Sequence, residues 1–95
     1  MSSLEVVFVA AHGTVWSGQA AQVVVPAVDG SMGILPRMQP TLAVLRRGPV
    51  RIIAEDGSVT EVQVDGGFVS MDENVVTIGV DDVEMDRSSA DAARL

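Results

Sequence analysis

Residues 50–65 decide the fold class of this chain, and they read Val-Arg-Ile-Ile-Ala-Glu-Asp-Gly-Ser-Val-Thr-Glu-Val-Gln-Val-Asp. Asp56-Gly57 is a strong short hairpin signal, and β-branched residues are frequent on both sides of it. After the turn, Val62 and Val64 alternate with polar residues, which is typical of a strand with one buried face. This stretch therefore predicts an antiparallel hairpin.

Strand signals continue outward from this hairpin in both directions. Gly18 is expected to end a short strand, and Val23-Val24-Val25 has no polar face, which predicts burial on both sides. Short strands separated by turn signals favour an all-β fold, a sandwich or flattened barrel. The further predicted strands are Leu4–Ala10, Thr14–Trp16, Gln22–Pro26, Thr41–Leu45, Phe68–Met71 and Val75–Val80.

The segment Asp29–Gly33 is predicted to be a glycine-rich turn. Apolar residues lie in or beside it and continue further along the chain, although a loop is ordinarily polar. They could form a protein-docking surface, for which methionine is well suited, or the core of a tightly wound corner. Both interpretations stay open from the composition alone. The residues concerned are Met32, Ile34, Leu35, Met38 and Leu42.

Length and charge limit the classes of function. The 95 residues make one small domain, and an apolar share of 47% is enough for one modest core. The net charge of −7, with no lysine, argues against a nucleic-acid partner, which requires clustered cations. Cysteine is absent, so disulfides are excluded. The longest apolar run, Val6–Ala11, is far shorter than the roughly 20 residues of a membrane helix. We therefore expect a cytosolic chain without direct membrane insertion.

No catalytic residue, metal site or cofactor is predicted. The single histidine, His12, is interpreted as a surface turn residue, because acid–base catalysis needs several groups that converge in one site. Asp81, Asp82, Glu84 and Asp86 form the densest carboxylate group, which on a strand could coordinate a hard cation. We favour the alternative that they form a charged edge, which opposes strand pairing with other molecules.

Several motifs follow one another in the order and spacing of a known family. On these motifs, residues 4–84 resemble the epsilon subunit of F-type ATP synthases. The motifs are Val15-Trp16-Ser17-Gly18, Asp29-Gly30-Ser31-Met32-Gly33-Ile34-Leu35-Pro36, Pro40-Thr41-Leu42, Gly48-Pro49-Val50-Arg51-Ile52, Asp65-Gly66-Gly67-Phe68-Val69 and Val75-Val76-Thr77-Ile78.

The resemblance implies a ten-stranded β-sandwich at the foot of the central stalk. In this role the chain is a non-catalytic rotor subunit that couples the gamma subunit to the membrane c ring during proton-driven ATP synthesis. It lies peripherally at the cytoplasmic face of the bacterial plasma membrane. By position, the expected ring contact comprises Asp29, Gly30, Ser31, Met32 and Gly33, and the expected gamma contact comprises Met38, Leu42 and Ala43.

Two of these positions depart from the family pattern. Met38 stands where the family usually has histidine, so an apolar contact is kept and a polar one is lost. Ser31 replaces a frequent glutamate, which weakens any charge pairing with basic loops of the ring.

The sequence changes character near residue 84. We expect residues 1–84 to form the sandwich domain and residues 85–95 to form a short acidic, alanine-rich tail. This tail is expected to begin a truncated helical region and to fray, because so short a helix is not stable alone. Asp91 and Arg94 match part of a family ATP-binding motif, but its second helix is absent, so no useful ATP affinity is expected. The inhibitory mode with an extended helical hairpin is expected to be missing.

Two other functions compete with this reading. A stand-alone carbohydrate- or ligand-binding sandwich ordinarily offers exposed aromatic side chains, and only Phe8, Trp16 and Phe68 are present. A small metal-dependent enzyme would have to use the carboxylates at 81–86. Neither alternative explains the ordered motifs.

Overall fold

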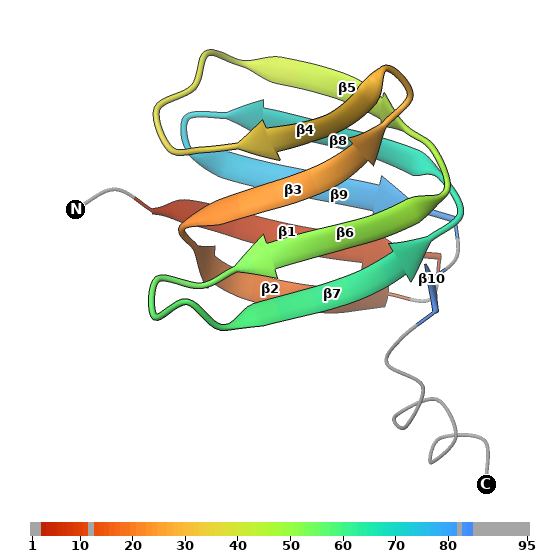
Figure 1. Ribbon diagram of the computed structural model, residues 1–95, viewed down its shortest axis with the longest axis horizontal. Helices are drawn as coiled ribbons and strands as arrows, with labels where there is room; N and C mark the ends of the chain where they lie inside the picture. Colours follow the sequence, from red (N-terminus) through yellow and green to blue (C-terminus); the bar gives the residue numbers. More distant parts are fainter. Residues whose placement is uncertain (1–2, 12, 82, 85–95) are drawn as a thin grey trace, which may run out of the picture.

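The computed structural model describes residues 3–11, 13–81 and 83–84, which form ten β-strands and no helix (Figure 1). The all-β prediction is therefore confirmed. The strands are β1 (Leu4–Ala10), β2 (Gly13–Ala20), β3 (Gln22–Ala27), β4 (Gly30–Ile34), β5 (Thr41–Leu45), β6 (Gly48–Ile53), β7 (Val59–Val64), β8 (Gly67–Asp72), β9 (Val75–Val80) and β10 (Val83–Glu84).

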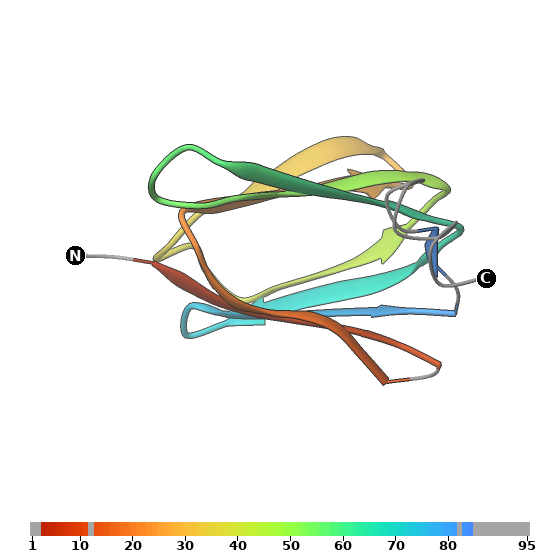
Figure 2. The ribbon, with the colours of Figure 1, turned by 90° about the horizontal axis from the view of Figure 1, so that it is seen from below.

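The strands lie in two layers that are joined along one side (Figure 2). One layer contains β4, β3, β6, β7 and β10 in that order, and the other contains β5, β8, β9, β1 and β2. The pairing of Ala27 with Leu45 connects β3 to β5, and hence one layer to the other. β1 and β9 run parallel, whereas β1 and β2 run antiparallel. The result is a β-sandwich made from one strongly curled sheet.

Alternating apolar residues fill the space between the layers. In β1, Leu4, Val6 and Phe8 are fully buried and Glu5 is exposed, as the alternation in the sequence predicts. No polar or charged side chain is buried among the described residues. The core is held together by hydrophobic burial, to which each large side chain contributes roughly 1.5–3 kcal/mol. Other large buried side chains are Ile34, Ile52, Met71 and Ile78.

The segment predicted to be a glycine-rich turn is mostly a strand. Val28 and Asp29 alone form the turn between β3 and β4, because Ala27 pairs with Gly30. The rest of the segment pairs along β3 and leads Ile34 into the core. The prediction was wrong because pairing with β3 over the whole of β4 outweighs the low strand propensity of glycine.

Two further expectations about strands are corrected. Gly18 does not end β2, which continues to Ala20. The indole of Trp16 packs over Gly18, where an added Cβ would lie 3.0 Å from Trp16 Cη2, so an aromatic ring covers the backbone of the glycine. Val24 is half-buried and not fully buried, because no other described strand covers the outer face of β3.

The predicted hairpin joins β6 to β7 through residues 54–58. The N–H of Ala54 donates to the carbonyl of Ser58 at 2.8 Å. The Oδ1 atom of Asp56 accepts hydrogen bonds from the backbone N–H of Ser58 at 2.9 Å and from its hydroxyl at 2.7 Å. These bonds stabilise the carboxylate and lower the pKa of Asp56 from its ordinary value. The bond from the backbone N–H has the larger effect on this pKa, and the bond from the hydroxyl has the smaller one.

Several predictions concern residues outside the described part of the chain. The expected boundary after residue 84 and the helical character of residues 85–95 therefore stay predictions. No helix within the described residues is long and apolar enough to cross a membrane. The individual residues that fall outside are His12, Asp82, Asp86, Asp91 and Arg94, and for Glu84 only the backbone is described.

Candidate functional site

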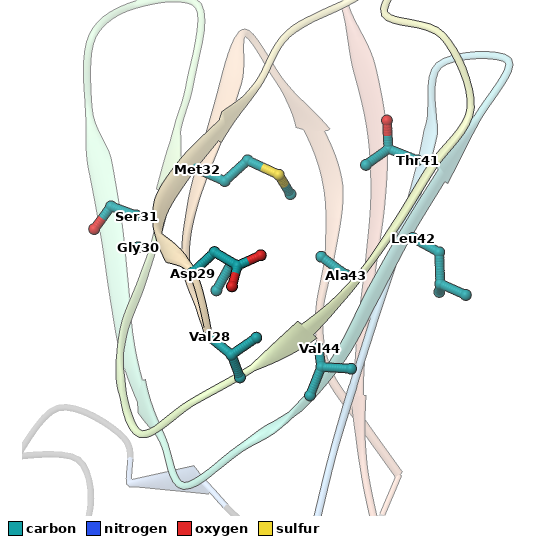
Figure 3. A pocket seen from close by; sticks show the side chains of 10 residues that line it. Val28, Asp29, Gly30, Ser31, Met32, Thr41, Leu42, Ala43 and Val44 are labelled. Carbon is teal, nitrogen blue, oxygen red and sulfur yellow. The ribbon is translucent and has the colours of Figure 1, made fainter.

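Residues expected at two different interfaces line the two walls of a shared groove (Figure 3). The groove has a volume of about 540 Å³ and opens between β4 and β5, which lie at the edges of the two layers. Residues 29–32 of the expected ring contact lie on one side, and Leu42 and Ala43 of the expected gamma contact lie on the other. Gly33 and Met38 do not line it.

The β4 wall combines an apolar inner face with a polar outer face. Met32 is half-buried and packs against the core, whereas Ser31 and Gly33 are exposed. Figure 3 shows Met32 and Asp29 pointing into the groove and Ser31 pointing away from it. Asp29 carries the only charged side chain among the lining residues. This wall therefore offers one apolar contact and one carboxylate.

The β5 wall is apolar except for the hydroxyl of Thr41, which donates to the carbonyl of Gln39. Ala43 is half-buried and packs against the core. Leu42 and Val44 alternate with it and are 74% and 60% exposed. Figure 3 shows Ala43 pointing into the groove and Leu42 pointing away from it. The structure therefore places two expected gamma-contact residues on opposite faces of the same strand.

Two side chains hold the loop between these walls. The Sδ atom of Met38 accepts a hydrogen bond from the N–H of Leu35 at 3.2 Å, and Oδ1 of Asn74 accepts one from the N–H of Arg37 at 2.7 Å. Because sulfur is a weak acceptor, the second bond is the stronger. Met38 therefore keeps a polar contact, but this contact lies within its own loop.

Sequence reasoning missed two exposed apolar residues that lie near Leu42, namely Val44 in β5 and Phe68 in β8. Phe68 in β8 pairs with Val44 and is 45% exposed. Its ring lies over Gly79 of β9, where an added Cβ would lie 2.5 Å from Phe68 Cε1. We name Leu42, Val44 and Phe68 the β5–β8 patch. The sequence signal for it is that β5 has no polar face, which a half-exposed strand would ordinarily have.

Other kinds of site find little support in the described part of the chain. It contains no group of three or more His, Cys, Asp or Glu side chains placed to hold a metal ion. Of the three aromatic side chains, Phe8 is buried and Trp16 is half-buried, so Phe68 is the exposed one. A single exposed ring does not make the aromatic platform expected of a carbohydrate-binding sandwich.

One known protein family matches this chain over all of the described residues. The model of the family described as "ATP synthase, Delta/Epsilon chain, beta-sandwich domain" matches residues 3–86. The chain belongs to this ATP synthase delta/epsilon family. Family membership agrees with the resemblance carried by the ordered motifs.

Curated relatives of this delta/epsilon chain include bacterial proteins named ATP synthase epsilon chain. That of Streptomyces coelicolor is 42% identical over 77 residues, which cover 81% of this chain and 62% of the relative. That of Micrococcus luteus is 37% identical over 90 residues, which cover 95% of this chain and 99% of the relative. The delta/epsilon chain thus spans less than two thirds of the first relative and nearly all of the second.

Solved structures share the fold of this delta/epsilon chain at low sequence identity. A chain of the Euglena gracilis mitochondrial ATP synthase, from a structure of OSCP/F1/c-ring, superposes with a TM-score of 0.83 and 19% identity, covering 98% of this chain and 62% of that chain. A chain of the Tetrahymena thermophila mitochondrial ATP synthase, from a structure of the central stalk/c-ring, superposes with a TM-score of 0.70 and 20% sequence identity. The superposition covers 86% of this chain and 66% of that chain. At these identities the likeness establishes the sandwich fold alone.

Proposed function

We propose that this delta/epsilon chain is a non-catalytic rotor subunit of a proton-transporting ATP synthase. In this role it couples the gamma subunit to the membrane c ring during ATP synthesis. The observation that carries the proposal is the shared groove, which residues expected at both partners line in a member of this family. A closely packed body that contacts both partners can transmit torque between them, because packed protein interiors are stiff.

The gamma contact is assigned to the β5–β8 patch together with Met38 and Ala43. Three large apolar side chains at adjacent positions on one outer face are typical of the centre of a protein interface. The ring contact is assigned to residues 29–33, which form the turn and the edge strand on the other wall. The two contacts are therefore neighbours on the surface of this chain.

The proposed location is the cytoplasmic face of a bacterial plasma membrane, as a peripheral part of the complex. Bacterial relatives such as those of Streptomyces and Micrococcus support this location. The role requires neither a cofactor nor a catalytic residue in this chain, because gamma and the ring are held by contacts alone.

A charge in the β5–β8 patch tests the gamma contact. Leu42→Asp places a carboxylate at a position that is 74% exposed, so the fold is expected to persist. Binding to purified gamma should weaken by about tenfold or more, since a charge at an apolar interface must lose its water. The matched control is Val59→Asp, because Val59 is 47% exposed on β7 in the other layer.

The outcomes of this experiment separate two errors. If Leu42→Asp binds gamma as tightly as the unmodified chain does, the assignment of the patch is wrong. If the unmodified chain binds neither gamma nor the c ring in a pull-down, the rotor function itself is wrong.

A further inference from the structure

Ser31 and Gly33 direct their backbone groups away from β3, toward the free edge of β4. The carbonyl of Pro26 accepts a hydrogen bond from the N–H of Arg46 at 2.8 Å, so it points away from β4. Pro26 pairs with Ser31, and this pair therefore belongs to the positions of the ladder that exchange no hydrogen bonds. The N–H and C=O of Ser31 then point outward, and those of Gly33 follow two residues later.

Leu42 presents a corresponding edge on β5. The carbonyl of Val44 accepts a hydrogen bond from the N–H of Val28 at 3.0 Å, so the backbone of Val44 points away from β8. Leu42 lies two residues earlier in the same strand, and its N–H and C=O point the same way. Among the described strands, β4 pairs with β3 alone. The seam between the two layers is thus closed near Val28 and open beyond it.

We propose that this open seam is a slot for one extended segment of the gamma subunit, which adds as a β-strand between β4 and β5. The inference rests on the proposed rotor function. Paired strands lie about 4.8 Å apart in the hydrogen-bonding direction, so a strand that bonds to both edges needs a gap of roughly twice that spacing, and the groove between β4 and β5 is the place for it. Strand addition satisfies the backbone groups of both edges and is an established mode of peptide recognition. It also covers edges that would otherwise be open to aggregation.

The groove defines the chemistry of the segment. Side chains that point inward meet Met32, Ala43 and the half-buried Thr41, so this face of the groove favours mainly apolar side chains. Asp29 is the only charged lining side chain, in a chain of net charge −7, and it favours a Lys or Arg near the closed end. Leu42 and Val44 belong both to the groove and to the β5–β8 patch. A partner seated on the patch therefore reaches the slot, which assigns the segment and its contacts with Asp29 and Met32 to gamma. On the β4 wall, the Ser31 side chain, which points away from the groove, is left to the ring.

Amide hydrogen exchange of the full chain, measured by NMR with and without purified gamma, tests the slot. Binding should slow the exchange of the Ser31, Gly33 and Leu42 amides by at least about tenfold, because each acquires a hydrogen-bond partner. The Met32 and Ala43 amides are internal controls, since they already face β3 and β8 and should change little. A complex in which the first three amides stay unprotected overturns the slot and leaves the rotor function intact. Protection of these amides by the c ring and not by gamma overturns the assignment to gamma, and the absence of any complex overturns both proposals.

A proline substitution provides a second, independent test. Ser31→Pro removes a donor that β3 does not use, and proline is tolerated on an edge strand. The dissociation constant for gamma should rise by about tenfold, while Ser31→Ala, which keeps the N–H, should bind like the unmodified chain. Equal affinities of the two variants, with circular dichroism showing both folded, contradict the slot. If Ser31→Pro does not fold, the exchange measurement decides alone.

Discussion

The Oδ1 atom of Asn74 accepts a hydrogen bond from the backbone N–H of Arg37 at 2.7 Å. Both residues have left-handed backbones, with φ of 66° at Asn74 and 68° at Arg37, a conformation that asparagine tolerates well. The backbone carbonyl of Asn74 also accepts from the N–H of Glu5 at 2.8 Å. One residue thus joins the loop beside the groove to the turn between β8 and β9 and to the start of β1.

Removing the Asn74 side chain should loosen this junction. Asn74→Ala loses the acceptor and places alanine in a left-handed backbone, so the free energy of unfolding in urea should fall by about 1–2 kcal/mol. Asn74→Asp keeps an acceptor at the same place, so its free energy of unfolding should fall by less. Equal losses in the two variants would show that the side-chain bond contributes nothing.

Gly67 should tolerate no side chain. Its φ is 143°, and an added Cβ would clash with the carbonyl oxygen of Gly79 and lie 2.9 Å from Cα of Val80, both parts of the backbone. Gly67→Ala should destabilise the chain by about 2–4 kcal/mol in thermal or urea unfolding. Gly57→Ala is the matched control, because φ is 93° there with no atom within 4 Å of the Cβ, and it should lose only about 1 kcal/mol.

The Asp56 hairpin should contribute stability that depends on pH. Hydrogen bonds from Ser58 lower the pKa of Asp56 in the folded state. The contribution is therefore present above the unfolded pKa of about 3.9 and is lost as the pH falls through the folded value. The stability difference between the unmodified chain and Asp56→Asn should shrink from pH 7 to pH 2.5. A difference that is constant over this range, with Glu55→Gln as the control for charge, contradicts this account.

Charge substitutions on the two faces of β4 should differ in their effects. Met32→Asp puts a carboxylate against the core and should reduce the free energy of unfolding by about 2 kcal/mol or more, so it does not test the ring contact cleanly. Ser31 is exposed, and Ser31→Glu restores the residue that is frequent in the family. If the ring loops are basic, Ser31→Glu should bind the c ring about two- to fivefold more tightly at low salt. Ser31→Gln adds no charge, so its affinity for the c ring should not rise. Equal affinities of Ser31→Glu and Ser31→Gln for the c ring would argue against a ring contact at this position.

The sequence predicted strands well where alternation or β-branched residues marked them, and β1, β5 and β9 have the expected bounds. It failed at β4 and in the second half of β2, where glycines read as turns. In both places a contact outside the local sequence decides the structure: the pairing with β3 holds Met32 in a strand, and Trp16 covers Gly18.

The groove could not be predicted for a related reason. It exists because β4 and β5 diverge on either side of the connection between Ala27 and Leu45, and this divergence depends on pairing partners far away in the sequence. Phe68 was missed because exposure on an outer sheet face depends on whether another layer covers it. The resemblance placed the contact residues by position, but only the structure shows that the two sets share one space.

The parallel pairing of β1 with β9 has a consequence for how the chain folds. Glu5 lies opposite Val75 and Phe8 lies opposite Ile78, so one central ladder joins the first strand to the ninth. A ribosome must therefore release almost the whole sandwich before β1 can pair with β9, although β2 can pair with the other edge of β1 much earlier. Contacts between such distant residues slow folding, and all-β domains of this kind fold in milliseconds to seconds. During that interval Leu4–Ala10 is a mainly apolar strand with one unpaired edge. We expect a chaperone to bind this segment in preference to others.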